Sequence, residues 1–298
     1  MPARMPLSPT QLALVDAWFG EWELRDDHSW GIQGIHVLRI ATAQGDVSVK
    51  ASEATHHIAR EARAHRQMTG PLLDLEPART PRMLHADVRA GILAATWLPG
   101  QLVEGGPHAY SAEAFHQAGE LLALVHVPRE QTNSYDPAAL NKAVDFLGRA
   151  TDLAPAEQLR AVGRVIAGHE SAPRLLVATH GDFQPRNWIE HGDWSSGQGL
   201  ISIIDWGRAG YRPWVTDLVR LEHGCFQPRP DEPAHDAAQL RAAFYAGYGR
   251  DPAEEPESWR LDNLLQALGT IVWAHEVGDP AFEDEGRRML ARVVEWFA

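Results

Sequence analysis

Residues 175–189, LLVATHGDFQPRNWI, run from an apolar stretch into a polar loop and then return to apolar residues. The loop holds an acid, Asp182, and an amide, Asn187, five positions apart. A second apolar stretch, residues 200–204, ends directly in Asp205, so we expect neighbouring antiparallel strands with these polar side chains at their ends. Carboxylate and amide oxygens suit Mg²⁺, which takes few protein ligands beside waters and phosphates. The pattern indicates a cation site at Asn187 and Asp205, with Asp182 facing an incoming hydroxyl group.

The rest of the chain divides into a β-rich first third and a mainly helical remainder. Before residue 98 the patterns predict a helix that Ser8-Pro9 begins and Gly20 ends, a helix at 55–69, and strands at 22–26, 36–40, 47–51, 83–87 and 91–97. After the break at residues 98–100 they predict helices at 112–126, 234–248, 257–277 and 280–297. We therefore expect an α+β protein with a hinge near residues 96–100.

The composition limits the class of protein. Of the 298 residues, 44% are hydrophobic and 22% charged, which is typical of a globular fold. The net charge of −13 argues against nucleic acid or an anionic membrane as a partner and favours a cationic one. A single cysteine, Cys225, excludes an internal disulfide framework. The N-terminus shows no signal-peptide pattern and residues 121–127 are too short an apolar run to span a membrane, so we expect a soluble, cytoplasmic protein.

Lysine is rare in this chain. Only Lys50 and Lys142 are lysines, and the other basic residues are arginines. An ammonium and a guanidinium differ in shape and in hydrogen bonding, so a position that keeps lysine under such a bias can require the ammonium. The alternation of residues 47–51 places Lys50 on the opposite strand face from Val47 and Val49.

The ordered motifs resemble the aminoglycoside phosphotransferase and related small-molecule kinase superfamily, which shares the protein-kinase fold. The matching elements are Lys50, Arg60-Glu61, Leu98-Pro99-Gly100, residues 121–126, His180-Gly181-Asp182 with Asn187, Ile204-Asp205 and Asp217-Leu218. The resemblance covers about residues 22–221. It implies a two-lobed fold, with residues 1–97 as a nucleotide-binding lobe of antiparallel sheet and helix. Residues 98–298 would form a helical lobe with the catalytic loop and the acceptor site.

The resemblance implies transfer of the γ-phosphoryl group of ATP or GTP to a hydroxyl group of a small molecule. Asp182 would be the catalytic acid–base, and Asn187 and Asp205 would hold Mg²⁺. Lys50 would contact the donor phosphates. Its ion-pair partner would be Glu61, which matches the family in its helix placement, although Glu53 is nearer in sequence.

Further nucleotide contacts and supporting residues follow from the same resemblance. The base would meet the backbone at Thr96 and Leu98, and Ser29 and Gly31 would lie over the phosphates; a base bound through backbone atoms leaves ATP and GTP open. Two residues would support the site without doing chemistry, His180 and Asp217. The stretch 27–34 has only two glycines, and Ala-Pro-Glu is absent, which disfavours protein phosphorylation.

The acceptor is the least specified part. Superfamily members phosphorylate aminoglycosides, other hydroxylated antibiotics, choline, homoserine and sugars. The acidic excess favours a cationic acceptor, and among the acceptors of the superfamily we place aminoglycoside-type and other cationic antibiotics first, which predicts a resistance enzyme. A metabolic kinase for choline, homoserine or a sugar is the alternative. A catalytically silent nucleotide-binding protein is a third reading, against which the intact lysine, two aspartates and asparagine argue.

Acceptor-binding candidates lie in the last third of the chain. They are Glu222, Trp273, Glu276 and Asp279, with Glu283 as a further acid. Acidic side chains of this kind also occur on solvated helix faces, and a tryptophan on a helix also packs in a core. Both readings stay open for these residues.

Overall fold

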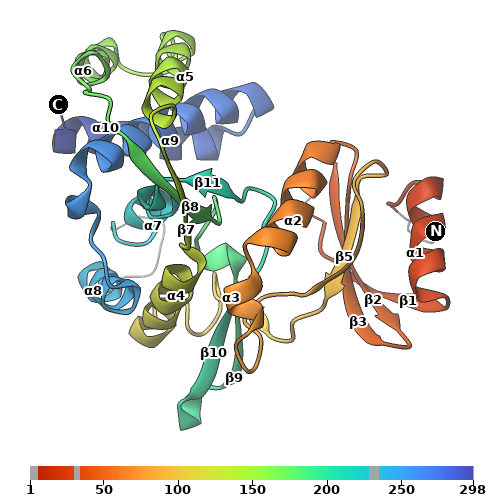
Figure 1. The fold of residues 1–298 in the computed structure, drawn as a ribbon. Helices are drawn as coiled ribbons and strands as arrows, with labels where there is room; N and C mark the ends of the chain where they lie inside the picture. The colour runs from red at the N-terminus through yellow and green to blue at the C-terminus, as the bar shows by residue number, and fades with distance from the viewer. Residues whose placement is uncertain (1–5, 30–33, 228–234, 298) are drawn as a thin grey trace. The chain divides into compact units, whose positions relative to one another are not determined.

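The computed structural model describes residues 6–29, 34–227 and 235–297. These residues form two compact units, one from the ranges 1–125 and 180–210, the other from 126–179 and 211–298. The α+β class predicted from the sequence is confirmed, with antiparallel sheet early in the chain and helices dominating later (Figure 1). The division into a nucleotide-binding lobe before residue 98 and a catalytic and acceptor lobe after it stays a prediction.

A five-stranded antiparallel sheet is the centre of the first unit. Its order is β1-β2-β3-β5-β4, with β1 at Trp22–Asp27, β2 at Ile35–Thr42, β3 at Gly45–Ser52, β4 at Met83–Asp87 and β5 at Ile92–Thr96. All five strands agree with the sequence prediction in type and position. Residue 50 on β3 pairs with residue 37 on β2 and residue 93 on β5, so the lysine lies on an interior strand.

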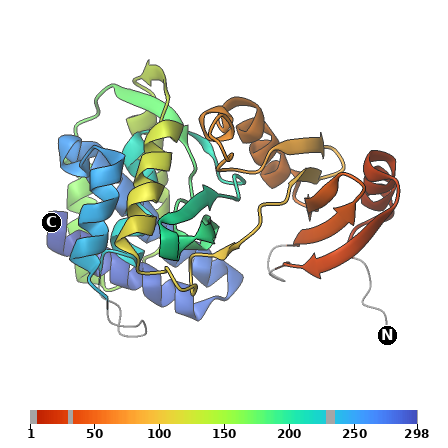
Figure 2. The ribbon, with the colours of Figure 1, turned by 90° about the horizontal axis from the view of Figure 1, so that it is seen from below.

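Helices α1 and α2 lie on opposite faces of this sheet (Figures 1 and 2). Helix α1, Pro9–Phe19, begins at a capping box formed by Ser8 and Gln11 and packs on one face with Val49 and Ala94. Helix α2, Thr55–Gln67, packs Ile58 and Ala62 on the other face. The period-two alternation of β3 assigns its valines to the α1 side and leaves residue 50 on the α2 side.

The remaining elements of the first unit include a second sheet, three-stranded and of order β10-β9-β6, and several helices. They are α3 (Gly70–Leu73), β6 (Gln101–Leu102), α4 (Ala112–Val125), η1 (Pro185–Asn187), β9 (Trp188–Asp193), η2 (Trp194–Ser196) and β10 (Gln198–Ile203). Residue 117 of α4 hydrogen-bonds the backbone of β10. The helix predicted at 55–69 is followed directly by the short helix α3, whose Pro71 is well accepted in a first turn.

The second unit joins a small sheet to a helical core. Its strands, β7 (Pro128–Thr132), β8 (Arg174–Thr179) and β11 (Gly210–Arg212), are ordered β11-β8-β7. Its helices are α5 (Tyr135–Arg149), α6 (Ala156–Ala167), η3 (Trp214–Asp217), α7 (Val219–Gly224), α8 (Ala237–Tyr248), η4 (Pro252–Glu254), α9 (Pro256–Val277) and α10 (Pro280–Phe297). Leu159, Val162, Leu268, Ile271 and Leu290 are among the residues that close the core of α5, α6, α9 and α10.

The structure corrects one expectation about the strands. The partner of β10 is β9, which follows the polar loop, whereas β8, which precedes the loop, belongs to another sheet. The sequence shows that both flanking stretches are apolar, and apolarity alone does not specify which of them pairs with β10. Among the described residues, no helix has the length and apolar character needed to cross a membrane.

Candidate active site

The side chain of Lys50 forms two ion pairs. From β3 its ammonium nitrogen Nζ lies 2.8 Å from Oε2 of Glu61 on α2 and donates to Oδ1 of Asp205 at 2.6 Å. Asp205 follows β10 by two residues, so strand, helix and hairpin each supply one charged group. Of the two glutamates considered from the sequence, Glu61 is the one paired with the lysine.

The electrostatics of this triad keep the lysine charged. Lys50 and Glu61 are buried, whereas the Asp205 side chain is 46% exposed. Burial opposes the charge on Lys50, but the carboxylates of Asp205 and Glu61 outweigh it and raise its pKa. Burial raises the pKa of Glu61, and the nearby Lys50 only partly offsets this. Desolvation likewise opposes ionisation of Asp205, yet the ammonium of Lys50 holds its pKa below the usual value.

The backbone at Asp205 is strained. Its φ of +62° makes it the one non-glycine residue with positive φ in the described part of the chain. Such a conformation costs on the order of 1 kcal/mol and is often found at functional sites. Gly207, two residues later, has no side chain that would approach the ion pair. A Cβ at this position would lie 3.3 Å from Oδ1 of Asp205 and 3.5 Å from Nζ of Lys50.

The loop before β9 holds the carboxylate of Asp182 with three donors. Gln184 donates through Nε2 to Oδ1 at 2.6 Å, and Arg186 donates through Nη2 to Oδ2 at 2.9 Å. Nδ2 of Asn187 donates to the Asp182 carbonyl at 2.8 Å and lies 3.3 Å from Oδ2. Gln184 and Arg186 were not singled out from the sequence. The available signal was the separation of four residues between the opposite charges of Asp182 and Arg186.

His180 links this loop to the segment that carries Asp205. Its Nδ1 accepts from the backbone N–H of Asp182 at 3.3 Å, so the neutral ring carries its proton on Nε2 and donates it to the carbonyl of Ile204 at 2.9 Å. The backbone N–H of Ile204 in turn donates to the carbonyl of Asn187 at 3.0 Å. Because of these bonds, the loop and the end of β10 hold one another in place.

The oxygen donors of Asn187 and Asp205 fit a magnesium ion. The described residues contain no group of three or more His, Cys, Asp or Glu side chains that could hold a metal by themselves. Asn187 uses its amide nitrogen within the loop, which leaves its oxygen Oδ1 able to bind a cation, and Asp205 is an exposed, ionised carboxylate. Two hard oxygen donors are too few for a closed metal cage, but they suit Mg²⁺, which keeps waters and binds phosphates.

The other residues predicted to meet the nucleotide lie at or just after the ends of strands β1 and β5. Ser29 follows β1, its N–H donates to Asp27, and its hydroxyl accepts from the N–H of Val37 at 3.2 Å. Thr96 ends β5 and donates its backbone N–H to the carbonyl of Arg82 at 2.9 Å. Leu98 follows two residues later and is half-buried. The prediction for Gly31 lies outside the described residues.

The second unit holds the remaining predicted residues. Asp217 is buried and accepts from Nε2 of His126 at 3.1 Å, and the other ring nitrogen of His126 lies 2.7 Å from the hydroxyl of Tyr248. Glu222 is buried and accepts from Tyr245 at 2.6 Å. Its pKa is raised by burial.

The other acceptor candidates have structural partners as well. Trp273 packs edge-on against a phenylalanine, with ring centres 5.7 Å apart. Glu276 forms an ion pair with Arg149. Asp279 accepts the N–H of residue 282 in the first turn of α10, and Glu283 pairs with an arginine one turn later in that helix. These contacts describe each side chain, and their proposed roles toward an acceptor remain predictions.

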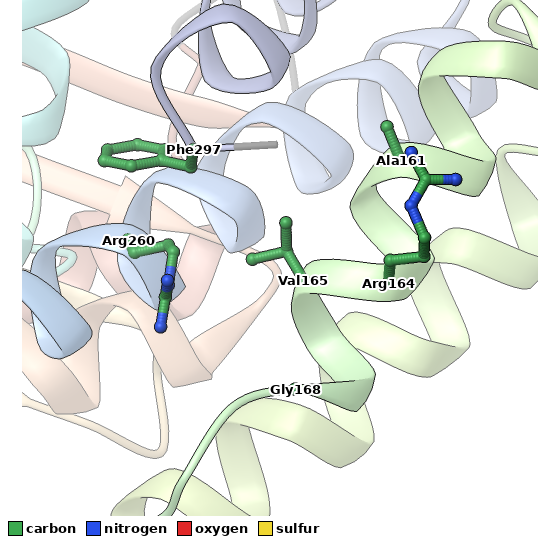
Figure 3. A pocket seen from close by; sticks show the side chains of 6 residues that line it. All are labelled: Ala161, Arg164, Val165, Gly168, Arg260 and Phe297. Atoms are coloured by element: carbon green, nitrogen blue, oxygen red, sulfur yellow. The ribbon is translucent and has the colours of Figure 1, made fainter.

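A separate pocket lies in the helical unit (Figure 3). It has a volume of about 240 Å³ and is lined by Ala161, Arg164, Val165, Gly168, Arg260 and Phe297. In Figure 3 the guanidinium groups of Arg164 and Arg260 point away from one another rather than converging. The pocket contains none of the residues predicted from the sequence.

Solved structures with this fold align with nearly the whole chain. A thermostable mutant of aminoglycoside phosphotransferase APH(4)-Ia aligns with a TM-score of 0.68 at 12% identity, covering 96% of this chain and 99% of the other. The streptomycin–ATP complex of APH(2")-IIa gives 0.63 at 12% identity, covering 96% of both chains. Macrolide 2'-phosphotransferase MphH from Brachybacterium faecium gives 0.60 at 18% identity, covering 94% and 96%. At these identities the similarity shows a shared fold.

The sequence comparison goes further than the fold. No curated protein sequence matches this chain significantly. The profile of the phosphotransferase enzyme family (APH) does match, over residues 33–265. That range contains β2, extends into α9 and includes Lys50, Asp182, Asn187 and Asp205. The chain therefore belongs to the phosphotransferase enzyme family and is a small-molecule phosphotransferase.

Proposed function

We propose that this enzyme transfers the γ-phosphoryl group of ATP or GTP to a hydroxyl group of an aminoglycoside-type or other cationic antibiotic, and so confers resistance. The observation that carries the proposal is the double ion pair of Lys50 with Glu61 and Asp205, formed in the same compact unit as the Asp182–Asn187 loop. A lysine held between a helix carboxylate and a cation-binding carboxylate is suited to the phosphates of a nucleotide.

The donor would be held by the five-stranded sheet and the segments that follow its strands. Lys50 contacts the α- and β-phosphates, and Glu61 orients its ammonium group. The base hydrogen-bonds the backbone at Thr96 and Leu98, while Ser29 and Gly31 lie over the phosphates. Neighbouring structures hold ATP in one case and GDP in another, which supports a nucleotide donor and leaves the choice of base open.

Asn187 and Asp205 would hold Mg²⁺ through the amide oxygen and the carboxylate. When bound, the ion neutralises charge on the phosphate oxygens, which is the main electrostatic demand of phosphoryl transfer. The strained backbone at Asp205 supports this role, because a strained residue persists only where surrounding structure holds it.

Asp182 would act on the acceptor. Its carboxylate orients the hydroxyl group and takes the proton while the acceptor oxygen bonds to the γ-phosphorus. The bond from that phosphorus to the β–γ bridging oxygen breaks, and the nucleoside diphosphate leaves. Positioning and charge compensation supply most of the rate enhancement in such reactions. His180 supports the loop without contacting the reacting atoms, and the supporting role of Asp217 stays a prediction.

The acceptor class is inferred from charge and from the neighbours. The net charge of −13 favours a cationic small molecule. Neighbouring structures are complexes with gentamicin, streptomycin, kanamycin and hygromycin B. We assign acceptor binding to Glu222, Trp273, Glu276 and Asp279.

A coupled assay of nucleoside diphosphate release tests the function directly. Wild type and Asp182→Ala are assayed with ATP and with GTP against aminoglycosides, a macrolide, choline, homoserine and simple sugars. Release that depends on an aminoglycoside and is lost in the variant supports the proposal. Release only with choline, homoserine or a sugar contradicts the antibiotic assignment and favours the metabolic alternative. If none of the acceptors in the panel supports release and the protein does not bind nucleotide, the phosphotransfer proposal itself is contradicted.

A further inference from the structure

Both oxygens of the Asp182 carboxylate receive hydrogen bonds from its own loop. Oδ1 accepts from Nε2 of Gln184 at 2.6 Å, and Oδ2 accepts from Nη2 of Arg186 at 2.9 Å. Rotation of the carboxylate about the Cβ–Cγ bond is normally broad and roughly two-fold. Here such a rotation would break both hydrogen bonds at once. These two neighbours, with Nδ2 of Asn187 at 3.3 Å from Oδ2, therefore fix the plane of the carboxylate.

The backbone that carries these two donors is itself fixed. Pro185, between them, is buried and has a restricted φ, and it starts the short helix η1. The N–H of Asn187 closes the turn by donating to the carbonyl of Gln184 at 2.8 Å. Arg186 therefore projects from a rigid turn, so little additional conformational entropy is lost in holding its backbone.

Arg186 also compensates charge. Asp182 is 6% exposed, and its negative charge acts unfavourably on the neighbouring carboxylate of Asp205. A buried carboxylate without compensation costs several kcal/mol. A guanidinium at 2.9 Å provides compensation from a planar group that can keep the carboxylate in one orientation.

We propose that Arg186 is a positioning residue for phosphoryl transfer: together with Gln184 it holds the Asp182 carboxylate in the orientation that meets the acceptor hydroxyl group. This inference rests on the proposed function, because it acts through the carboxylate to which that function assigns the acceptor. It assigns Arg186 no contact with nucleotide or metal. The effect of removing it should therefore appear in the transfer step and not in nucleotide binding.

The test is a kinetic comparison of wild type with Arg186→Ala. We expect kcat to fall by about 10- to 100-fold, since a misplacement of about 1 Å can cost about 100-fold. The KM for the nucleotide and its dissociation constant, measured with a fluorescent nucleotide, should stay within about twofold. Guanidinium ion added at millimolar concentration should restore part of kcat in Arg186→Ala and have no such effect on Asp182→Ala.

Conservative variants separate geometry from charge. Arg186→Lys keeps the charge and should retain more activity than Arg186→Gln, which keeps only a donor. Gln184→Ala and the double variant complete a double-mutant cycle, in which two residues that hold one carboxylate give non-additive losses of kcat. Arg25→Ala is the matched control, because Arg25 pairs with Glu23 on the surface with side chains 49% and 69% exposed. Its kinetics should equal those of wild type.

The outcomes distinguish the inference from the proposed function. If wild type turns over nucleotide and Arg186→Ala keeps kcat within twofold, the inference is wrong while the function stands. A loss of nucleotide affinity equal to the loss of kcat, without guanidinium rescue, also overturns it and indicates a structural role. If Arg186→Ala melts far below wild type, the same criteria apply to Arg186→Lys and Arg186→Gln. Absence of turnover and of nucleotide binding in wild type contradicts the proposed function, and the inference with it.

Discussion

The ammonium of Lys50 on β3 donates to the carboxylate of Asp205 at 2.6 Å, although 155 residues separate them in the chain. The same ammonium lies 2.8 Å from Glu61. A cation placed between two carboxylates balances one of the two negative charges and leaves the group with a net negative charge. Such a group can accept a further cation, and the lysine can exchange one carboxylate partner for phosphate oxygens without a change of strand or helix.

Lys50→Arg should lower kcat/KM for the nucleotide by about tenfold or more. A guanidinium is planar and wider than an ammonium, and it would press against Glu61 or displace the phosphates. Steady-state kinetics check the result, with a thermal melt of each protein to show that the fold is kept. Lys142→Arg, at the other lysine of the chain and on an exposed position of α5, is the matched control and should be neutral. Equal kcat/KM in the two variants would mean that the phosphate contact lies elsewhere.

Asp182→Ala should lower kcat by about 100- to 10,000-fold, the range typical of a lost general base. Nucleotide affinity should stay nearly unchanged, because the carboxylate is assigned to the acceptor. Single-turnover kinetics and nucleotide titration measure the two quantities separately. A variant that keeps most of its turnover would remove Asp182 from this role.

Asp205→Asn should weaken nucleotide binding that depends on magnesium, since it removes the anionic one of the two proposed ligands. The measurement is a nucleotide titration at several magnesium concentrations. We expect the magnesium concentration for half-maximal binding to rise by about tenfold or more. Asp193→Asn, an exposed aspartate of β9, serves as the control. An unchanged magnesium requirement in Asp205→Asn would contradict the metal assignment.

The pH dependence of stability should report on Asp262 in the helical unit. Burial raises the pKa of this carboxyl group to about 6, against hydrogen bonds from Tyr135 and Thr216 that lower it. The folded protein thus binds this proton more tightly than the unfolded chain does. Its contribution to the free energy of unfolding is complete below about pH 4 and is lost as the pH rises to about 6.

Asp262→Asn removes this titration. Relative to the variant, wild type should lose up to about 3 kcal/mol of unfolding free energy between pH 4 and pH 7. Urea denaturation of both proteins across this range gives the difference. Asp284→Asn, whose side chain is 61% exposed, is the control and should show a flat difference from wild type. A flat difference for Asp262→Asn as well would mean that the buried carboxyl titrates normally.

The elements of the fold were largely predictable because their signals are local. Helix α1 has its proline and its capping serine, and strand β3 alternates between apolar and polar residues over residues 47–50. Strand β8 was the exception in its pairing. An apolar run can pair with any other apolar run of similar length, so the sheet to which β8 belongs depends on long-range packing.

The sequence also showed which residue types form the candidate site and in which order they occur. They are an acid and an amide five positions apart, an acid at the end of a strand, and a rare lysine. Their assembly was not visible in the same way. Glu61 meets Lys50 from α2, whereas Glu53 lies in the bend between β3 and α2, so the choice between them depends on how α2 packs against β3. The donors of Gln184 and Arg186 to Asp182 depend on the turn of η1, which a sequence pattern does not specify.

The sequence by itself determined the five strands of the first sheet, helices α1, α2, α4, α8, α9 and α10, and the candidate side chains for phosphate, cation and hydroxyl group, whereas helices α5 and α6 were not predicted. The predicted features follow from local propensity and periodicity, which act over a few residues. Only the tertiary structure decided which charges meet. The pairing of Lys50 with Asp205 and the positive φ of Asp205 arise where β3, α2 and the β9–β10 hairpin pack together. Such contacts join residues far apart in the chain, and their energy depends on distances that packing sets.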